Sequence, residues 1–305
     1  MVRDFYYPSC GVGNIRARYW EPEQKPLAIV QLVHGIAEHV ERYDPFAAWL
    51  NDQGYLVVAQ DHMGHGKTCN DSQPKGYFYK GWFSAAEDTY ALLRSTMERF
   101  PEIPYILFGH SMGSFLVRTI LAKHPDSGIA GCIICGTGWM PDIVLGAGKL
   151  VSGVVCKLGG EDKPSRLLQT MMFGSYNQRI EHHRTDFDWL TRDSRIVDAY
   201  ISDPDCGFIA SAGLVRDMMS GMRYNQKPAA LARMDKSLPV FFIAGGEDPV
   251  GSYGDGVKIA VQKFKDSGMQ NVSCKIYPLC RHEILNELNK EEVFRDIHNW
   301  LRNII

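Results

Sequence analysis

The 305-residue sequence lacks a long hydrophobic run: no stretch approaches the roughly 18 consecutive apolar residues that suggest a transmembrane helix. Its opening, MVRDFYYPSC, has no apolar segment behind a basic start, so we do not expect a secretory signal peptide. The net charge is only −2, which gives no basic footprint for nucleic acid. We therefore expect a cytoplasmic protein without nucleic-acid partners. Its oligomeric state leaves no signal in the sequence.

Eight cysteines are scattered along the chain, which favours reduced and mostly buried thiols over a disulfide framework. Cys132 and Cys135 form a CxxC pair inside GIAGCIICGTG, an apolar run that predicts a buried strand. Residues three apart on a strand point to opposite faces, so this pair suits neither a shared metal nor redox chemistry. We predict no metal site and no cofactor.

Six short apolar runs predict strands buried on both faces of a mostly parallel sheet, at 27–33, 55–60, 105–108, 129–134, 240–244 and 272–277. Helical spacing appears at 45–52, 85–100, 257–267 and 290–305. The alternation of strands and helices predicts an α/β fold with a doubly wound sheet. Residues 4–20, which contain the turn signal GVGN, predict an antiparallel hairpin at the sheet edge.

The alternation stops between residues 139 and 236, where helix-like stretches and paired charges dominate. We interpret 139–236 as a helical cap inserted between two late strands. Residues 1–138 and 237–305 then form the core domain. We expect the charged stretch RIEHHRTDFDWLTRD to hold the helices of the cap together rather than to bind a charged head group.

The pentapeptide Gly109-His110-Ser111-Met112-Gly113 matches G-x-S-x-G and lies between a predicted strand and a predicted helix. This setting is typical of a nucleophile elbow, in which a sharp turn exposes a strained serine. Glycine on either side removes side chains that would collide in such a turn. Ser111 is therefore the candidate nucleophile.

A serine hydroxyl needs a base to take its proton and a carboxylate to orient that base. Asp248 follows the strand that ends in FFIAGG, and His282 follows the last strand, in the order Ser, acid, His that this elbow requires. Weaker alternatives for the acid are Glu247 and Asp255. Other histidines lie on predicted helices or in the insertion, namely His124, His298, His182 and His183. Adjacent residues such as the last two rarely bind one metal ion.

The oxyanion of a tetrahedral intermediate needs two backbone donors. We predict the amides of Met112 and of Ile36, with Gly35 allowing close approach of the backbone. Two polar loops, HGIAEH and DHMGHG, are expected to be joined by hydrogen bonds from four side chains, those of His34, Glu38, Asp61 and His65.

Together, HGIAEH, DHMGHGKT, GHSMGS, GGEDPV and the late RHE resemble the monoacylglycerol lipase and lysophospholipase-like branch of the α/β-hydrolases, the serine-aminopeptidase-like hydrolase family of bacterial type. The resemblance covers almost the whole chain. It implies an α/β-hydrolase fold with a cap over an acyl pocket, and ester hydrolysis without a cofactor. By position it assigns Ser111, Asp248 and His282 as the triad. The sequence departs from this family at Leu279-Cys280, where smaller residues are common, and this places a thiol near His282.

The predicted cap is rich in apolar side chains. A helix over 140–158 has Ile143, Ala147, Leu150, Val151, Val154 and Leu158 on one face, and Met171-Met172-Phe173 and Met218-Met219 add flexible groups. At least half of these should pack the cap on the core, and the rest could line a tunnel for an acyl chain. The expected partner is a small ester, and transient contact of the cap with a membrane surface is consistent with this composition.

Three functions remain open from the sequence. The first is a monoacylglycerol lipase or lysophospholipase. The second is a general carboxylesterase or an aminopeptidase that uses the same triad. An aminopeptidase needs an acid at the entrance, for which Glu181, Asp186 and Asp188 are available. The third, a non-catalytic binding protein, is disfavoured by the intact triad.

Overall fold

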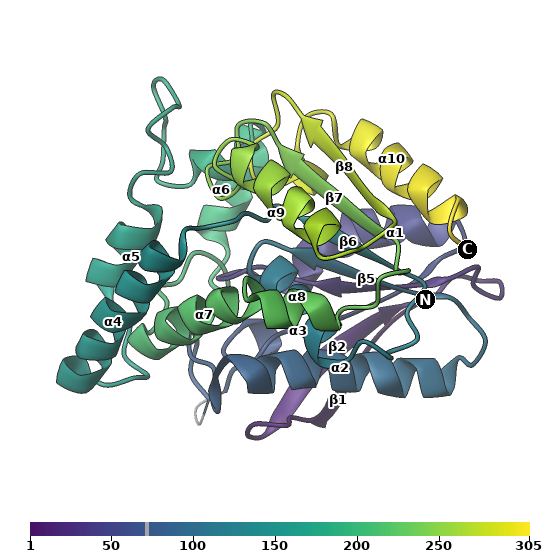
Figure 1. The fold of residues 1–305 in the computed structure, drawn as a ribbon, viewed down its shortest axis with the longest axis horizontal. Coiled ribbons are helices and arrows are strands. Elements are labelled where there is room, and N and C mark those ends of the chain that lie inside the picture. Colours follow the sequence, from purple (N-terminus) through teal and green to yellow (C-terminus); the bar gives the residue numbers. More distant parts are fainter. Residues whose placement is uncertain (71–72) are drawn as a thin grey trace.

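The computed structural model describes residues 1–70 and 73–305 (Figure 1). Within these residues, eight strands form one sheet in the order β1-β2-β4-β3-β5-β6-β7-β8. They are β1 (Val2–Pro8), β2 (Asn14–Trp20), β3 (Ile29–Val33), β4 (Leu56–Gln60), β5 (Tyr105–His110), β6 (Gly131–Cys135), β7 (Val240–Gly245) and β8 (Val272–Tyr277). The strands β3 to β8 pair in parallel, whereas β1 and β2 form the predicted antiparallel edge hairpin.

Strands β3 to β7 are buried at every position, because helices cover both faces of the sheet. This is why their sequences are continuous apolar runs rather than alternating ones. Cys132 and Cys135 belong to the hydrophobic clusters on opposite faces, as their spacing predicted. The predicted α/β sheet architecture is therefore confirmed.

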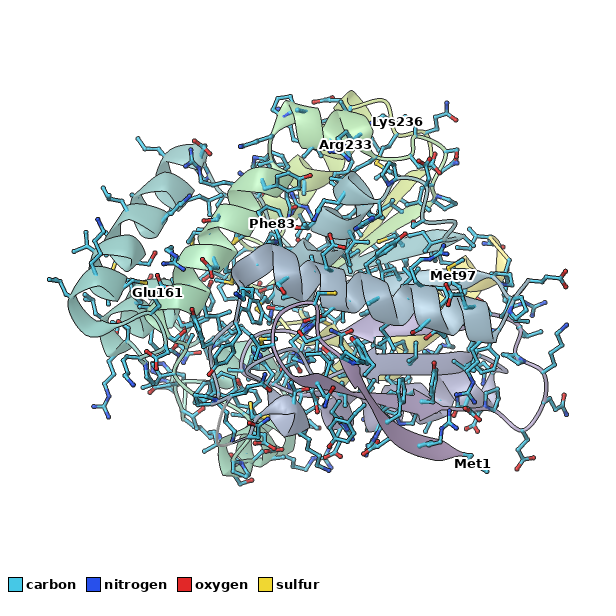
Figure 2. The ribbon with its side chains drawn as sticks, turned by 90° about the horizontal axis from the view of Figure 1, so that it is seen from below. Met1, Phe83, Met97, Glu161, Arg233 and Lys236 are labelled. Atoms are coloured by element: carbon cyan, nitrogen blue, oxygen red, sulfur yellow. The ribbon has the colours of Figure 1, made fainter. Side chains whose placement is uncertain are left out.

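Two groups of helices cover the sheet. Helices α1 (Asp44–Asp52) and α10 (Lys290–Arg302) contribute to the cluster on one face. Helices α2 (Gly81–Arg99), α3 (Met112–Lys123) and α9 (Asp255–Asp266) contribute to the cluster on the other. Figure 2 shows α2 along the outside of the molecule, with Phe83 near one end and Met97 near the other.

Between β6 and β7 the chain forms α4 (Asp142–Gly159), α5 (Arg166–Phe173), α6 (Ser194–Ser202), α7 (Ala212–Asn225) and α8 (Pro228–Arg233). The hydroxyls of Ser165 and Ser211 cap α5 and α7 by accepting backbone N–H groups of the first turn. Helix α7 packs against α3 and α4, and α4 and α5 lie at the far end of the molecule from the C-terminus (Figure 1). Short 3₁₀ turns complete the chain: η1 (Val40–Tyr43), η2 (Gly66–Thr68), η3 (Asp188–Leu190) and η4 (Ile284–Asn286).

Helix α4 presents its most apolar side chains to solvent. Ile143, Leu150 and Leu158 are 81%, 70% and 85% exposed, whereas the buried face carries Leu145 and Cys156. Helix α4 packs against α7, and Ile143, Leu150 and Leu158 stay exposed to solvent. The prediction that these three side chains pack on the core or line a tunnel is therefore wrong. Among the described residues, no helix combines the length and apolar character needed to cross a membrane.

Candidate active site

Ser111 lies at the sharp turn between β5 and α3. Its backbone has φ 54° and ψ −122°, a conformation that costs a non-glycine residue about 1–3 kcal/mol. The turn is fixed because the Ser111 N–H donates to the Cys135 carbonyl at 3.0 Å, and the Ser111 carbonyl accepts both the N–H and the hydroxyl of Ser114. Ser111 lines a cavity of about 530 Å³.

The two glycines of the pentapeptide are required by close backbone contacts. A Cβ atom on Gly113 would lie 2.0 Å from the Val33 carbonyl oxygen, and one on Gly109 would lie 2.6 Å from the Gly113 carbonyl oxygen. A larger residue at Gly113 would therefore push α3 away from β3, and one at Gly109 would push α3 away from β5. The flanking glycines let the serine turn sit directly on the sheet.

His282 and Asp248 form a buried pair on neighbouring loops. Nδ1 of His282 lies 3.0 Å from Oδ2 of Asp248, and both side chains are at most 2% exposed. The other carboxylate oxygen of Asp248 accepts the N–H of Val250 at 2.9 Å. This arrangement favours a proton on Nδ1 of His282, which leaves Nε2 free to act as a base. His282 lines the same cavity as Ser111.

The rival acids lie elsewhere. Glu247 is exposed, and Asp255 is exposed at the start of α9, where it pairs with Lys258. His182 is exposed in the β6–β7 segment, and His183, although exposed, lies on the cavity wall. Of the candidate acids and histidines, the structure brings together only Asp248 and His282.

Aromatic side chains from the β6–β7 segment form much of the cavity wall, and sequence reasoning missed most of them. They are Phe173, Phe187, Trp189, Tyr200 and Phe208. The Trp189 ring centroid lies 5.0 Å from that of His282. Of the methionine-rich groups proposed to line the pocket, only Phe173 does so, and Met218 and Met219 are buried in the core. No local sequence pattern distinguishes these aromatic residues from ordinary core residues.

The loop after β3 passes directly beside Ser111. A Cβ atom on Gly35 would lie 3.0 Å from Cβ of Ser111, so the glycine permits this approach. Ile36 lines the cavity, and Met112 is the first residue of α3. Both predicted amide donors thus belong to backbone segments that flank the serine.

The buried carboxylate of Glu38 holds this loop in place. Its Oε1 accepts the N–H of Gly35 at 2.6 Å and the hydroxyl of Tyr43 at 3.0 Å, and it lies 3.2 Å from Nδ1 of His110. Burial alone would raise the pKa of Glu38, but contacts with His110 and Arg42 outweigh it and hold that pKa well below its usual value. Glu38 is therefore an anion that anchors the loop.

Arg42 ties three segments together. Its guanidinium donates two hydrogen bonds to Glu283, at 2.6 and 2.7 Å, and Glu283 directly follows His282. It also lies 4.8 Å from the ring centroid of Tyr200 in α6. Sequence reasoning missed the pairing of Arg42 with Glu283, although the motif RHE contained the acid. Such a buried, bidentate pair fixes the loop that carries His282.

Of the four side chains predicted to join the loops after β3 and β4, those of His34 and Asp61 do so. Glu38 bonds to Gly35, Arg42 and Tyr43, and Nδ1 of His65 lies 3.1 Å from the Met63 carbonyl of its own loop, so the prediction is wrong for these two. Nε2 of His34 accepts the N–H of His62 at 3.0 Å, and Asp61 accepts the N–H of Val40 at 2.9 Å. The rings of His34, His62 and His65 form a buried cluster, with centroids 4.2 and 5.3 Å from that of His34. Burial, assisted for His34 and His62 by neighbouring imidazoles, lowers the pKa of His62 to about 3, that of His65 to about 4, and that of His34 well below its usual value.

This histidine cluster predicts a loss of stability in mild acid. The unfolded chain binds protons on these histidines below about pH 6.5, whereas the folded chain does not, so stability falls as the pH drops from about 6.5 to about 5. Each histidine contributes up to about 1.4 kcal/mol per pH unit. Urea unfolding across this pH range should show that the free energy of unfolding falls less steeply with decreasing pH for His65→Gln than for wild type. The exposed His182→Gln is the control, and equal slopes for all three proteins would contradict this account.

Cys280 does not belong to the cavity wall. It is buried, and its Sγ lies 3.1 Å from Oδ1 of Asn289. Burial raises the pKa of this thiol to about 11. The thiol beside His282 in the sequence is thus directed toward the start of α10.

A mostly parallel sheet with a strained serine after β5 and a buried His–Asp pair after the last two strands defines an α/β-hydrolase. The family profile described as "Serine aminopeptidase, S33" matches residues 24–289, and the chain belongs to that family. The monoacylglycerol lipase of Mycolicibacterium smegmatis is 28% identical over 95% of this chain and 94% of its own. The monoglyceride lipase of Rattus norvegicus is 26% identical over 94% and 86%. A crystal structure of a thermostable carboxyl esterase from Bacillus coagulans, in complex with glycerol, superposes with a TM-score of 0.92 at 32% identity over 99% and 98%.

Proposed function

We propose that this protein is a serine hydrolase that cleaves carboxylic esters, with monoacylglycerols as its main substrates. The observation that carries the proposal is that His282, which is paired with the buried Asp248, lines the same cavity as the strained Ser111. Relatives named as monoacylglycerol lipases match nearly the full length of the chain and support the substrate class. We assign the triad to Ser111, His282 and Asp248, and the oxyanion donors to the amides of Ile36 and Met112.

In the proposed reaction, Oγ of Ser111 attacks the ester carbonyl while Nε2 of His282 takes its proton. The oxyanion receives hydrogen bonds from the amides of Ile36 and Met112. Collapse of the intermediate releases the alcohol, which takes the proton from His282, and leaves an acyl group on Ser111. Water then attacks this acyl-enzyme by the same steps and releases the acid. Asp248 stabilises the imidazolium in both halves of the reaction, and the proposed steps use no cofactor.

The β6–β7 segment, residues 139–236, acts in this proposal as a cap over the cavity. Its aromatic side chains give the wall an apolar character suited to an acyl chain. The alternative of an aminopeptidase requires an acid at the cavity, and Asp186 lies there. Asp188 is less suited, because it is buried and accepts hydrogen bonds from Thr185 and Arg184.

A substrate panel tests the proposed specificity. Purified protein is assayed with a monoacylglycerol, a lysophospholipid, a short-chain ester and an aminoacyl amide at matched acyl lengths. We expect kcat/KM to be at least about tenfold higher for the monoacylglycerol than for the lysophospholipid or the amide, since one well-placed contact discriminates by this factor. A preference for the amide would favour the aminopeptidase, and a preference for the lysophospholipid would move the substrate to that class.

We also propose that the exposed apolar face of α4 contacts a membrane surface during catalysis. Leu150 and Leu158 lie on the cap, and burying each such side chain stabilises contact by about 1.5–3 kcal/mol. The double variant Leu150→Ser, Leu158→Ser should therefore bind phosphatidylcholine vesicles at least about tenfold more weakly in a sedimentation assay. Leu288→Ser, at a leucine that is 63% exposed outside the cap, is the matched control. Unchanged binding of the double variant would refute this surface.

A further inference from the structure

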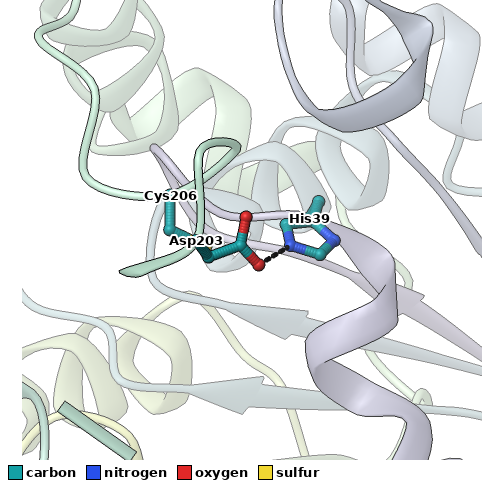
Figure 3. Close-up of side chains that lie close together, drawn as sticks. All are labelled: His39, Asp203 and Cys206. Carbon is teal, nitrogen blue, oxygen red and sulfur yellow. Dashed lines mark hydrogen bonds and ion pairs between the residues drawn. The ribbon is translucent and has the colours of Figure 1, made fainter. Parts of the chain in front are cut away.

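Three side chains that the proposed mechanism does not use meet where the β6–β7 segment touches the loop after β3 (Figure 3). Nε2 of His39 lies 2.8 Å from Oδ2 of Asp203, and Cys206 lies on the same short loop as Asp203. Nitrogen, oxygen and sulfur ligand atoms of these residues all lie within 4.8 Å of one another. Within residues 1–70 and 73–305, this is the one group of at least three His, Cys, Asp or Glu side chains so arranged. None of the three lines the cavity.

The backbone holds the two residues of the β6–β7 segment in position. The N–H of Cys206 donates to the Asp203 carbonyl at 3.1 Å, which closes a tight turn. The N–H of Asp205 donates to Oδ1 of Asp203 at 2.8 Å, so Oδ2 is left to face His39. His39 stands at the start of η1, in the loop that also carries Ile36. These hydrogen bonds set the backbone positions from which the three donor side chains face one another.

An imidazole nitrogen, a carboxylate oxygen and a thiolate sulfur form a donor set typical of zinc. Bond lengths of about 2.0–2.3 Å in a tetrahedral site place the donors about 3.3–3.8 Å apart, so side-chain shifts of about 1 Å would close this cluster around an ion. We propose that His39, Asp203 and Cys206 bind a zinc ion, with water as the fourth ligand, where the cap meets the loop after β3.

The charges around the cluster permit a divalent cation. Arg42 is the positively charged side chain with the strongest electrostatic effect on Cys206. Its charge is offset because it donates hydrogen bonds to the carboxylates of Glu38 and Glu283. Asp203 adds a further negative charge beside His39. The nearby Lys75 is paired with Asp205. An entering ion therefore meets no net positive field from these groups.

Zinc binding must release a proton. The ion replaces the proton of the Cys206 thiol, and this proton passes to solvent. The bound ion would fasten the cavity wall, because Gly207 and Phe208 directly follow Cys206 and line the cavity, and the Gly207 N–H already donates to the Ala37 carbonyl at 3.0 Å.

Cobalt titration tests this site without reference to catalysis, so its failure would leave the proposed hydrolase intact. Wild-type protein with Co²⁺ should show a sulfur-to-metal charge-transfer band that Zn²⁺ abolishes. Cys206→Ser should lose the band. Asp203→Asn, which changes a partly exposed residue, should bind Co²⁺ at least about tenfold more weakly. Cys274→Ser, at an exposed cysteine on β8, should retain wild-type binding.

Thermal unfolding gives an independent reading of the same site. Zn²⁺ should raise the Tm of wild type and of Cys274→Ser, because a ligand that binds the folded state stabilises it. It should not raise the Tm of Cys206→Ser, whose metal-free Tm shows whether it is folded. Absence of the charge-transfer band in wild type, or its persistence in Cys206→Ser, would overturn the proposal.

Discussion

Ser111→Ala should lower kcat for ester hydrolysis by at least about 10³-fold while leaving the protein folded. The change removes a hydroxyl that lines the same cavity as His282 and lies next to Gly35 in the loop containing Ile36. It leaves the hydrogen bonds that fix the turn, since these use the backbone of residue 111 and the side chain of Ser114. The cavity and the amide donors remain, so weak residual turnover is expected.

The measurement is kcat with a soluble ester under saturating conditions, together with Tm for folding. Ser95→Ala, at an exposed serine on α2, is the matched control and should hydrolyse the ester like wild type. Near-wild-type activity of Ser111→Ala would show that another group attacks the ester.

Asp248→Asn should lower kcat by about 10³- to 10⁴-fold. The carboxylate accepts two hydrogen bonds, from Val250 on Oδ1 and from His282 on Oδ2. Asparagine has one acceptor oxygen, so its amide must face one of the two donors. If the amide faces His282, the imidazole takes the tautomer with its proton on Nε2, and it can no longer accept a proton from Ser111.

The matched controls are the two acids that the sequence left as alternatives. Glu247→Gln and Asp255→Asn alter exposed carboxylates outside the cavity, so both should stay within about twofold of wild-type kcat. If either control lost more activity than Asp248→Asn, the acid of the triad would have to be reassigned.

Much of the fold could be predicted because its signals are local. The buried strands are apolar runs that lie between helical stretches, and the edge hairpin has a glycine-rich turn. The setting of Ser111 was also legible, since a strand, two glycines and a helix surround it within one short segment. The pairing of His282 with Asp248 could be predicted because chain order and strand ends narrow the choice, although Asp248 depended more on the family resemblance.

The rest depends on contacts between residues far apart in the sequence. Trp189 and Phe208 have no neighbours in sequence that distinguish a cavity wall from a core. The pairing of Arg42 with Glu283 joins residues 241 positions apart. The orientation of α4 was predicted wrongly, because an apolar stripe shows that a helix has an apolar face but not whether that face meets the core or the surroundings.

Labelling with a fluorophosphonate tests the central assignment most directly, because this reagent reacts with a serine only when a base activates it. Intact-mass analysis and peptide mapping of the folded protein should find one adduct, on Ser111. Asp248→Asn should label far more slowly. A folded wild-type protein without an adduct on Ser111, or with the adduct on another serine, would contradict the account.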